Sequence, residues 1–156
     1  MRPAADRVRE ALSSLGVAAE ILEFPQGTRT AADAAAAVQT SVGQIVKSLV
    51  FLADEKPLLV MASGANRVDL VRLAQALGVH AVRRADADTV RRVTGYAIGG
   101  VPPVGHDTPL TVVIDSDLLQ YDTVYASAGT PHAVFAIAPG RLAEITKATA
   151  ANVREG

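Results

Sequence analysis

The sequence has 156 residues and a mass of 16.2 kDa, which is the usual size of one domain. Hydrophobic residues make up 49% and charged residues 20%, a balance typical of a folded globular protein and not of a disordered one. The net charge of −1 excludes a polycation, so nucleic-acid binding would depend on a local basic patch. The absence of cysteine excludes disulfides, thiolate metal sites and a cysteine nucleophile. We expect a single domain over residues 1–156.

We expect no export signal in the N-terminal region. Residues 1–10 contain five charged side chains and lack the apolar stretch of a signal peptide. No segment approaches the roughly 18 consecutive apolar residues that a membrane-spanning helix needs. We therefore expect a cytoplasmic protein with no membrane partner.

The first part of the chain is predicted to form a helix, a strand and a second helix. Apolar residues at helical spacing predict a helix over residues 4–15, ended by Gly16. Residues 17–24 are rich in β-forming side chains and predict a strand. Thr30 is expected to cap a short helix of small residues, with Asp33 at its third position.

A β-hairpin is predicted next. Residues 45–53 carry the strongest strand pattern in the chain, and residues 58–62 should pair with them across a turn at residues 54–57. Asn66 is expected to cap the following helix, which Gly78 ends.

The second half of the chain contains closely spaced strands. We predict a helix over residues 85–93, a broken loop over 96–108, strands over 110–115, 123–127 and 133–138, a helix from Pro139 and a frayed tail over 148–156. The last three strands follow each other too closely for βαβ crossovers, which need about a dozen residues. The pattern therefore favours an α/β fold with a mixed sheet or partly closed barrel and short flanking helices over a doubly wound fold.

Lys47 is the first candidate functional residue. Only three of the 15 basic residues are lysines, and Lys47 alone lies inside an apolar strand. Side chains alternate along a strand, so Lys47 shares a face with Leu49 while Ser48 lies on the other face. Burial of a bare ammonium is costly. Lys47 therefore either extends to water at a sheet edge or points into a pocket for an anionic or ester-bearing ligand.

A stiff loop is the second candidate. Residues 99–106 read Gly-Gly-Val-Pro-Pro-Val-Gly-His, in which the glycines allow close backbone approach and the prolines fix the backbone. The segment matches neither the Walker pattern nor the dinucleotide-binding pattern of glycines. It is either a wide structural turn or a rigid loop whose amides surround a small group, and the histidine that follows favours a site.

Other polar residues are weaker candidates. Residues 128–132, Ala-Gly-Thr-Pro-His, are either an ordinary hairpin turn with an exposed His132 or part of a site. His80 is expected to be structural. The three histidines have no metal-ligand spacing, so we expect neither a metal nor another cofactor. A basic cluster, either a solvated face or a phosphate contact, is formed by Arg83, Arg84, Arg91 and Arg92.

Four segments in this order resemble the YbaK/ProX (YbaK/EbsC) family of aminoacyl-tRNA editing deacylases, relatives of the editing domain inserted in bacterial prolyl-tRNA synthetases. They are residues 30–35, 44–49, 99–106 and 128–132. The resemblance implies an α/β fold with a mixed, mostly antiparallel, barrel-like sheet and short flanking helices. It also implies hydrolysis of the ester that joins a wrong amino acid to tRNA, often the tRNA for proline.

The resemblance also implies roles for individual residues. Lys47 matches the essential strand lysine of the family, and residues 99–103 match its Gly-x-x-x-Pro loop. We expect Lys47, Gly99 and Gly100 to act in catalysis. Substrate-binding positions are expected at Ser48, Val101, Pro102, Pro103, Gly105, His106, Gly129 and His132.

Ester hydrolysis needs no cofactor. Lys47 would anchor the terminal adenosine or its phosphate, and amides of the loop would polarise the ester carbonyl as an oxyanion hole. A small pocket would exclude larger aminoacyl groups by size. We expect a mischarged tRNA as substrate, with a group such as Cys or Ala on the tRNA for proline, and prolyl-tRNA synthetase as a candidate partner. The alternatives are a non-catalytic module that binds a nucleotide or aminoacyl ligand, and an accessory protein that works on a synthetase.

Overall fold

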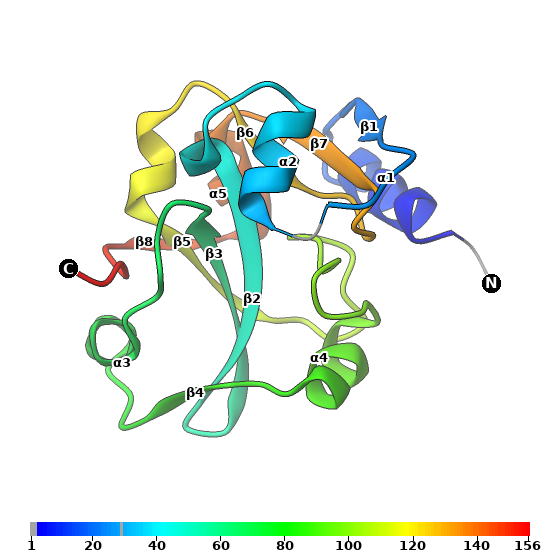
Figure 1. Cartoon of the computed structure of the whole chain (residues 1–156). Coiled ribbons are helices and arrows are strands. Elements are labelled where there is room, and N and C mark those ends of the chain that lie inside the picture. The colour runs from blue at the N-terminus through cyan, green and yellow to red at the C-terminus, as the bar shows by residue number, and fades with distance from the viewer. Residues whose placement is uncertain (1–2, 29) are drawn as a thin grey trace.

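The computed structural model describes residues 3–28 and 30–156, and its strands form one eight-stranded mixed sheet (Figure 1). The strands are β1 Ile21–Glu23, β2 Ile45–Ala53, β3 Lys56–Ser63, β4 Val82–Arg84, β5 Thr111–Asp115, β6 Val124–Ser127, β7 Ala133–Ile137 and β8 Thr149–Ala151. The helices are α1 Ala4–Ser14, α2 Ala31–Ala37, α3 Leu70–Leu77, α4 Ala87–Thr94 and α5 Pro139–Thr146, with 3-10 turns η1 Val42–Gln44 and η2 Ser116–Gln120. In the part of the chain that the structure describes, no helix has the length and apolar character to cross a lipid bilayer.

The sheet order is β1-β7-β6-β2-β3-β5-β8, and β4 also pairs with β2. Four pairs are antiparallel, namely β1–β7, β6–β7, β2–β3 and β2–β4. The pairs β2–β6, β3–β5 and β5–β8 are parallel. The predicted α/β class with a mixed, mostly antiparallel sheet is therefore confirmed.

β2 lies in the middle of the sheet and is buried on both faces, as its apolar pattern predicts. Val46 and Val50 point into the larger core cluster, which also contains Phe135 of β7. Phe51 points to the opposite face, into a smaller cluster with Leu73 of α3. Lys47 belongs to this second face because side chains alternate along the strand.

The hairpin turn between β2 and β3 is shorter than predicted. Asp54 and Glu55 alone form it, with φ angles of +46° and +67°. Two positive φ values in succession define the tight turn whose twist matches that of the flanking strands. Lys56 and Pro57 were expected in the turn but belong to β3, where they face Ala53 and Leu52.

The predicted cap of α3 is wrong. Asp69, not Asn66, caps this helix, because its carboxylate accepts hydrogen bonds from the N–H groups of Val71 and Arg72 at 3.0 and 3.1 Å. Asn66 uses its side chain for other contacts, described below. The predicted cap at Thr30 is confirmed, since its hydroxyl accepts from the N–H of Asp33.

Two short strands escape the sequence pattern. β4 precedes α4, and its start is held by the Asp54 carboxylate, which accepts from the N–H groups of His80 and Ala81. The prediction that residues 148–156 fray is wrong, because β8 pairs with β5 and Val153 is fully buried. The strand predicted over residues 17–24 is reduced to the three residues of β1, which pair with β7.

One edge of β2 is interrupted, and this gap positions the site. β6 pairs with β2 at Ile45 and Val46, and β4 pairs with it from Phe51 to Ala53. Between these contacts, no described strand pairs with residues 47–50 on this edge. In Figure 1, α2 crosses the upper part of β2, while β4 and α4 lie at its lower end. The cavity described below opens beside this interrupted stretch of the central strand.

Candidate active site

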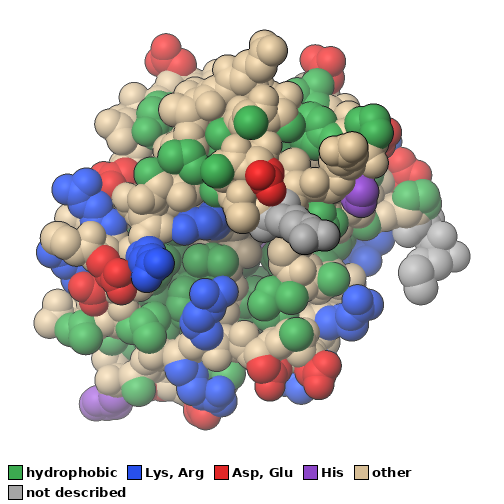
Figure 2. Space-filling model, in the orientation of Figure 1, with side chains coloured by type: hydrophobic (Ala, Val, Ile, Leu, Met, Phe, Trp, Pro, Cys, Tyr) green, Lys and Arg blue, Asp and Glu red, His purple; other side chains and the backbone are tan. Residues whose placement is uncertain are grey.

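A cavity of about 290 Å³ opens beside the interrupted edge of β2. Figure 2 shows this face hollowed at its centre, with a hydrophobic floor and a border of Lys and Arg side chains. Ligand pockets commonly measure about 300–1,000 Å³, so the cavity suits a small group. Its lining residues include Ala31, Ala34, Val46, Lys47, Ser48, Val50, Ile98, Gly99, Val101, Tyr125, Thr130, Pro131 and Val134.

Lys47 lies at the mouth of this cavity with its side chain half-buried. Its ammonium donates a hydrogen bond to the backbone carbonyl of Asn66. Burial lowers the pKa of Lys47, and the nearby positive charges of Arg84 and Arg67 lower it further, while Asp115 raises it. Lys47 therefore does not extend freely into water, and it forms no ion pair with any residue that the structure describes, so its remaining donors can bind a ligand.

Direct titration can check the environment of Lys47. The chain has only three lysines, so labelling them with 13C and 15N leaves few side-chain signals to assign by NMR. The midpoint of Lys47 should lie below that of the same side chain in the urea-unfolded protein. At pH values between the two midpoints, the unfolded chain binds more protons than the folded one. The contribution of Lys47 to the free energy of unfolding therefore rises with pH in this range. Equal midpoints in the two states would contradict this environment.

Ser48 offers a second polar group to the cavity. Its Oγ is buried and has no hydrogen-bond partner among the described residues. Backbone polar groups alternate between the two edges of a strand, and the carbonyl of Val50 faces the interrupted edge, where it accepts from the N–H of Ala85 at 3.2 Å. The backbone of Ser48 faces the same edge. Buried polar atoms are normally paired, so this hydroxyl is free to bind a group in the cavity.

The front of the glycine/proline loop forms part of the cavity wall. Gly99 and Val101 line it, and Gly99 has a φ of +89° that an L-residue rarely adopts. The N–H of Gly100 donates to the carbonyl of Ala97 at 3.0 Å, and its own carbonyl accepts from the hydroxyl of Ser127. The amide expected from Gly100 is thus used within the loop. An oxyanion hole here would draw on the N–H groups of Gly99 and Val101.

The back of the same loop supports the front. Pro102 and Pro103 are buried outside the cavity lining, and Gly105 turns with a φ of +82° beside Tyr96. The imidazole Nε2 of His106 lies 2.6 Å from the carbonyl of Pro102, a hydrogen bond that only an Nε2–H can donate. Burial lowers the pKa of His106 and therefore favours the neutral imidazole, here with its proton on Nε2. The structure thus places His106 as a brace of the loop, away from the cavity.

The segment at residues 128–132 contributes through residues that the sequence did not single out. Thr130 and Pro131 line the cavity. Gly129 instead packs against Ala4 of α1 and has a φ of +104°. His132 is exposed, and its Nδ1 lies 3.3 Å from the carbonyl of Phe24. The motif therefore correctly indicated a segment beside the cavity, but Gly129 and His132 themselves do not line it.

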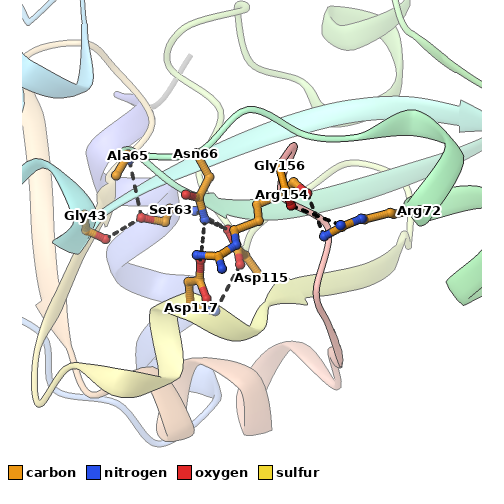
Figure 3. A network of polar contacts seen from close by, with 9 residues as sticks. All are labelled: Gly43, Ser63, Ala65, Asn66, Arg72, Asp115, Asp117, Arg154 and Gly156. Atoms are coloured by element: carbon orange, nitrogen blue, oxygen red, sulfur yellow. Dashed lines mark hydrogen bonds and ion pairs between the residues drawn. The ribbon is translucent and has the colours of Figure 1, made fainter.

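A buried carboxylate supports the partner of Lys47 (Figure 3). Asp115, at the end of β5, is fully buried and accepts hydrogen bonds from Ser63 N, Asn66 Nδ2 and Asp117 N at 3.0, 2.9 and 3.0 Å. The same Nδ2 donates to the Asp117 carboxylate at 2.8 Å, and that carboxylate pairs with Arg154. These bonds fix the Asn66 peptide whose carbonyl receives the ammonium of Lys47.

No described residues form a metal site, since no group of three His, Asp or Glu side chains lies suitably close. The polar groups at the cavity are an ammonium, a hydroxyl and backbone amides. Such a set can bind an anion or polarise a carbonyl group.

Known proteins are similar to this chain in sequence and in fold. The profile of a family described as the aminoacyl-tRNA editing domain matches residues 25–145. A crystal structure described as a proposed trans-editing enzyme for prolyl-tRNA synthetase superposes with a TM-score of 0.94 at 46% identity, covering 100% of this chain and 99% of that chain. An Enterococcus faecalis protein named as a proposed Cys-tRNA(Pro)/Cys-tRNA(Cys) deacylase, EbsC, is 29% identical over 113 residues, which are 67% of this chain and 69% of its own length. A proline–tRNA ligase of Lactobacillus gasseri is 38% identical over 72 residues, 46% of this chain and 13% of the ligase.

The fold and these similarities define an enzyme of the aminoacyl-tRNA deacylase class. The chain belongs to the aminoacyl-tRNA editing domain family, because the family profile spans most of its length. The resemblance to the YbaK/ProX group is thereby confirmed.

Proposed function

We propose that this chain acts in trans on mischarged tRNA and hydrolyses the ester of a small aminoacyl group, such as Cys or Ala, on the tRNA for proline. The observation that carries the proposal is the half-buried ammonium of Lys47 at the mouth of a small, mainly apolar cavity. The ammonium can hold the anionic end of the substrate while the cavity receives the aminoacyl side chain. Residues 1–156 would act as one domain in the cytoplasm, where tRNA is charged.

The reaction consumes one water molecule. Lys47 anchors the terminal adenosine or its phosphate at the interrupted edge of β2. The oxygen of water attacks the ester carbonyl carbon, and the water gives up a proton. The bond from that carbon to the ribose oxygen then breaks, and the ribose oxygen takes up a proton. The N–H groups of Gly99 and Val101 stabilise the negative charge on the carbonyl oxygen, and Ser48 Oγ binds the aminoacyl group.

Selection of the aminoacyl group would come from the size of the cavity. Val46, Val101, Tyr125 and Val134 bring apolar side chains to its wall, so a larger side chain meets packed atoms. A hydrophobic pocket excludes larger groups more effectively than it rejects smaller ones. A second active site of this kind removes amino acids that a synthetase accepts by mistake because they are small.

The test is a deacylation screen with purified protein. The tRNA for proline, charged separately with Ala, Cys, Ser and Pro, is compared with the cognate Ala and Cys pairs. We expect rates above spontaneous hydrolysis for the small groups on the tRNA for proline, and no acceleration for Pro. The Lys47→Ala variant is the matched control at each pair. Failure to accelerate any pair would contradict the proposal, and saturable binding of a nucleotide in that case would indicate a binding module.

Partner dependence is tested in the same assay. The matches to a proline–tRNA ligase and to a structure described as acting for prolyl-tRNA synthetase support prolyl-tRNA synthetase as the partner. A chain with a net charge of −1 should bind tRNA weakly by itself. Addition of this synthetase should therefore lower the KM for the charged tRNA. Activity that is absent without the synthetase would indicate an accessory protein.

A further inference from the structure

A second hollow lies on the face of β2 that carries Lys47, Leu49 and Phe51. Residues 67–71, which lead into α3, form its opposite wall, and Arg84 of β4 lies at its border. Lys47, Leu49 and Arg84 also line the first cavity, so the two hollows meet at the interrupted edge of β2. A ligand could therefore extend from one into the other past Lys47.

The second hollow gathers positive charge that the fold does not neutralise. Arg67, Arg84 and Lys47 line it together. Among the residues that the structure describes, neither Arg67 nor Arg84 forms an ion pair. The guanidinium of Arg84 lies 5.9 Å from the centre of the Phe51 ring, which holds it without an acidic partner. Both arginines lower the pKa of Lys47, as expected for a positive potential at this place.

The acidic residues of this hollow only partly offset that charge. Asp69 lines it, but its carboxylate accepts the N–H groups of Val71 and Arg72 at the start of α3. Glu155 is the other acid of the lining. The lining thus holds three positively charged side chains and two acidic ones, and the carboxylate of Asp69 is already used to cap α3. The remaining charge suits the hollow to an anion.

Neighbouring arginines behave differently. Arg83, next to Arg84 in the chain, binds both carboxylate oxygens of Glu55 at 3.0 Å. Arg154 pairs with Asp117, and Arg72 donates to the carbonyls of Arg154 and Gly156. Of the basic cluster that the sequence indicates, Arg84 is thus the member directed at the hollow, while Arg83 is occupied by Glu55.

We propose that this second hollow binds the phosphodiester backbone of the single-stranded 3′ end of tRNA, with Arg67 and Arg84 contacting the phosphates that precede the terminal adenosine. The inference rests on the proposed function, since the same 3′ end would carry the ester past Lys47 into the first cavity. A guanidinium binds phosphate through paired N–H groups. Leu49 and the exposed side chain of Val71 supply apolar surface against which a base can pack.

The test measures binding separately from hydrolysis. A fluorescently labelled single-stranded RNA that ends in CCA is titrated with protein over a range of salt concentrations, by fluorescence anisotropy. Arg67→Ala and Arg84→Ala should each weaken binding about threefold to tenfold and reduce the salt slope by about 0.7 for each phosphate that the variant no longer binds. Arg83→Ala is the matched control and should bind as the wild type does, because its charge is already paired.

Hydrolysis gives a second readout. The loss of kcat/KM caused by Arg67→Ala should be large for charged tRNA and small for 3′-aminoacyl-adenosine, which carries no phosphate. Unchanged RNA affinity and salt slope in both variants would overturn the inference. So would competition by inorganic phosphate or adenosine 5′-monophosphate as effective as competition by the oligonucleotide, because the hollow would then be a site for a small anion. If the wild type binds the RNA through these arginines but deacylates no charged tRNA, the proposed function fails while the inference stands.

Discussion

Lys47→Ala is expected to reduce kcat/KM for deacylation by about 10²–10³-fold, because the ammonium that anchors the terminal adenosine or its phosphate is lost and the ester is no longer held in position. The fold should persist, because Lys47 is only half-buried and its ammonium bonds to a backbone carbonyl. The variant frees the carbonyl of Asn66 but also removes a partly desolvated charge. We therefore expect the free energy of unfolding to change by no more than about 1 kcal/mol.

Two further variants distinguish charge from shape. Lys47→Met keeps the length of the side chain without its charge, so it should be as inactive as Lys47→Ala. Lys56→Ala removes an exposed lysine at the start of β3 and should leave deacylation unchanged. Single-turnover rates measured from low to saturating enzyme concentration give both kcat/KM and the rate of the chemical step, and urea denaturation measures stability. Near-wild-type activity of Lys47→Met would show that the ammonium does not take part in the reaction.

Asp115→Ala should have the largest effect on stability, a loss of about 2–4 kcal/mol. Its carboxylate is fully buried and receives three hydrogen bonds, so the substitution leaves the N–H groups of Ser63 and Asp117 without this acceptor, while Asn66 Nδ2 keeps only the Asp117 carboxylate. An unmet buried donor costs more than the bond itself contributes. Loss of the negative charge should also lower the pKa of Lys47 further, because Asp115 acts to raise it.

The matched control for this prediction is Asp117→Ala. Asp117 is part-exposed, and its carboxylate shares the amide of Asn66 with Asp115 and pairs with exposed Arg154, so its loss should cost clearly less. Chemical denaturation of the three proteins gives the free energies, and NMR titration of the lysine signals gives the pKa of Lys47. A free energy of unfolding for Asp115→Ala equal to that of Asp117→Ala would contradict the role assigned to the buried carboxylate.

Elements specified by local sequence were predictable. The pattern of β2 and the hydroxyl of Thr30 depend on neighbouring residues in the chain, and both predictions agree with the structure. β8 was missed because Thr-Ala-Ala carries little strand pattern of its own and forms only through pairing with β5. Asn66 was misassigned for a similar reason, since it is well suited to a helix cap but binds carboxylates 49 and 51 residues away.

The site was predictable to a similar extent. The isolated lysine and the glycine pattern indicated Lys47, Gly99 and Val101, which meet at one cavity. The orientation of His106 and His132 could not be read from the sequence, because it depends on the carbonyls of Pro102 and Phe24 in the folded chain. The second hollow could not be predicted from the sequence either, because Arg67 and Arg84 come together only when β4 pairs with β2.

The course of the C-terminal residues has a consequence for how the protein is handled. Val153 is fully buried, and Arg154 reaches Asp117, which holds the side chain of Asn66 and hence the carbonyl that receives Lys47. The N-terminal helix lies on the opposite side of the molecule (Figure 1). A purification tag or fusion partner attached after residue 156 would therefore lie beside the residues that hold the carbonyl bound by Lys47 in place.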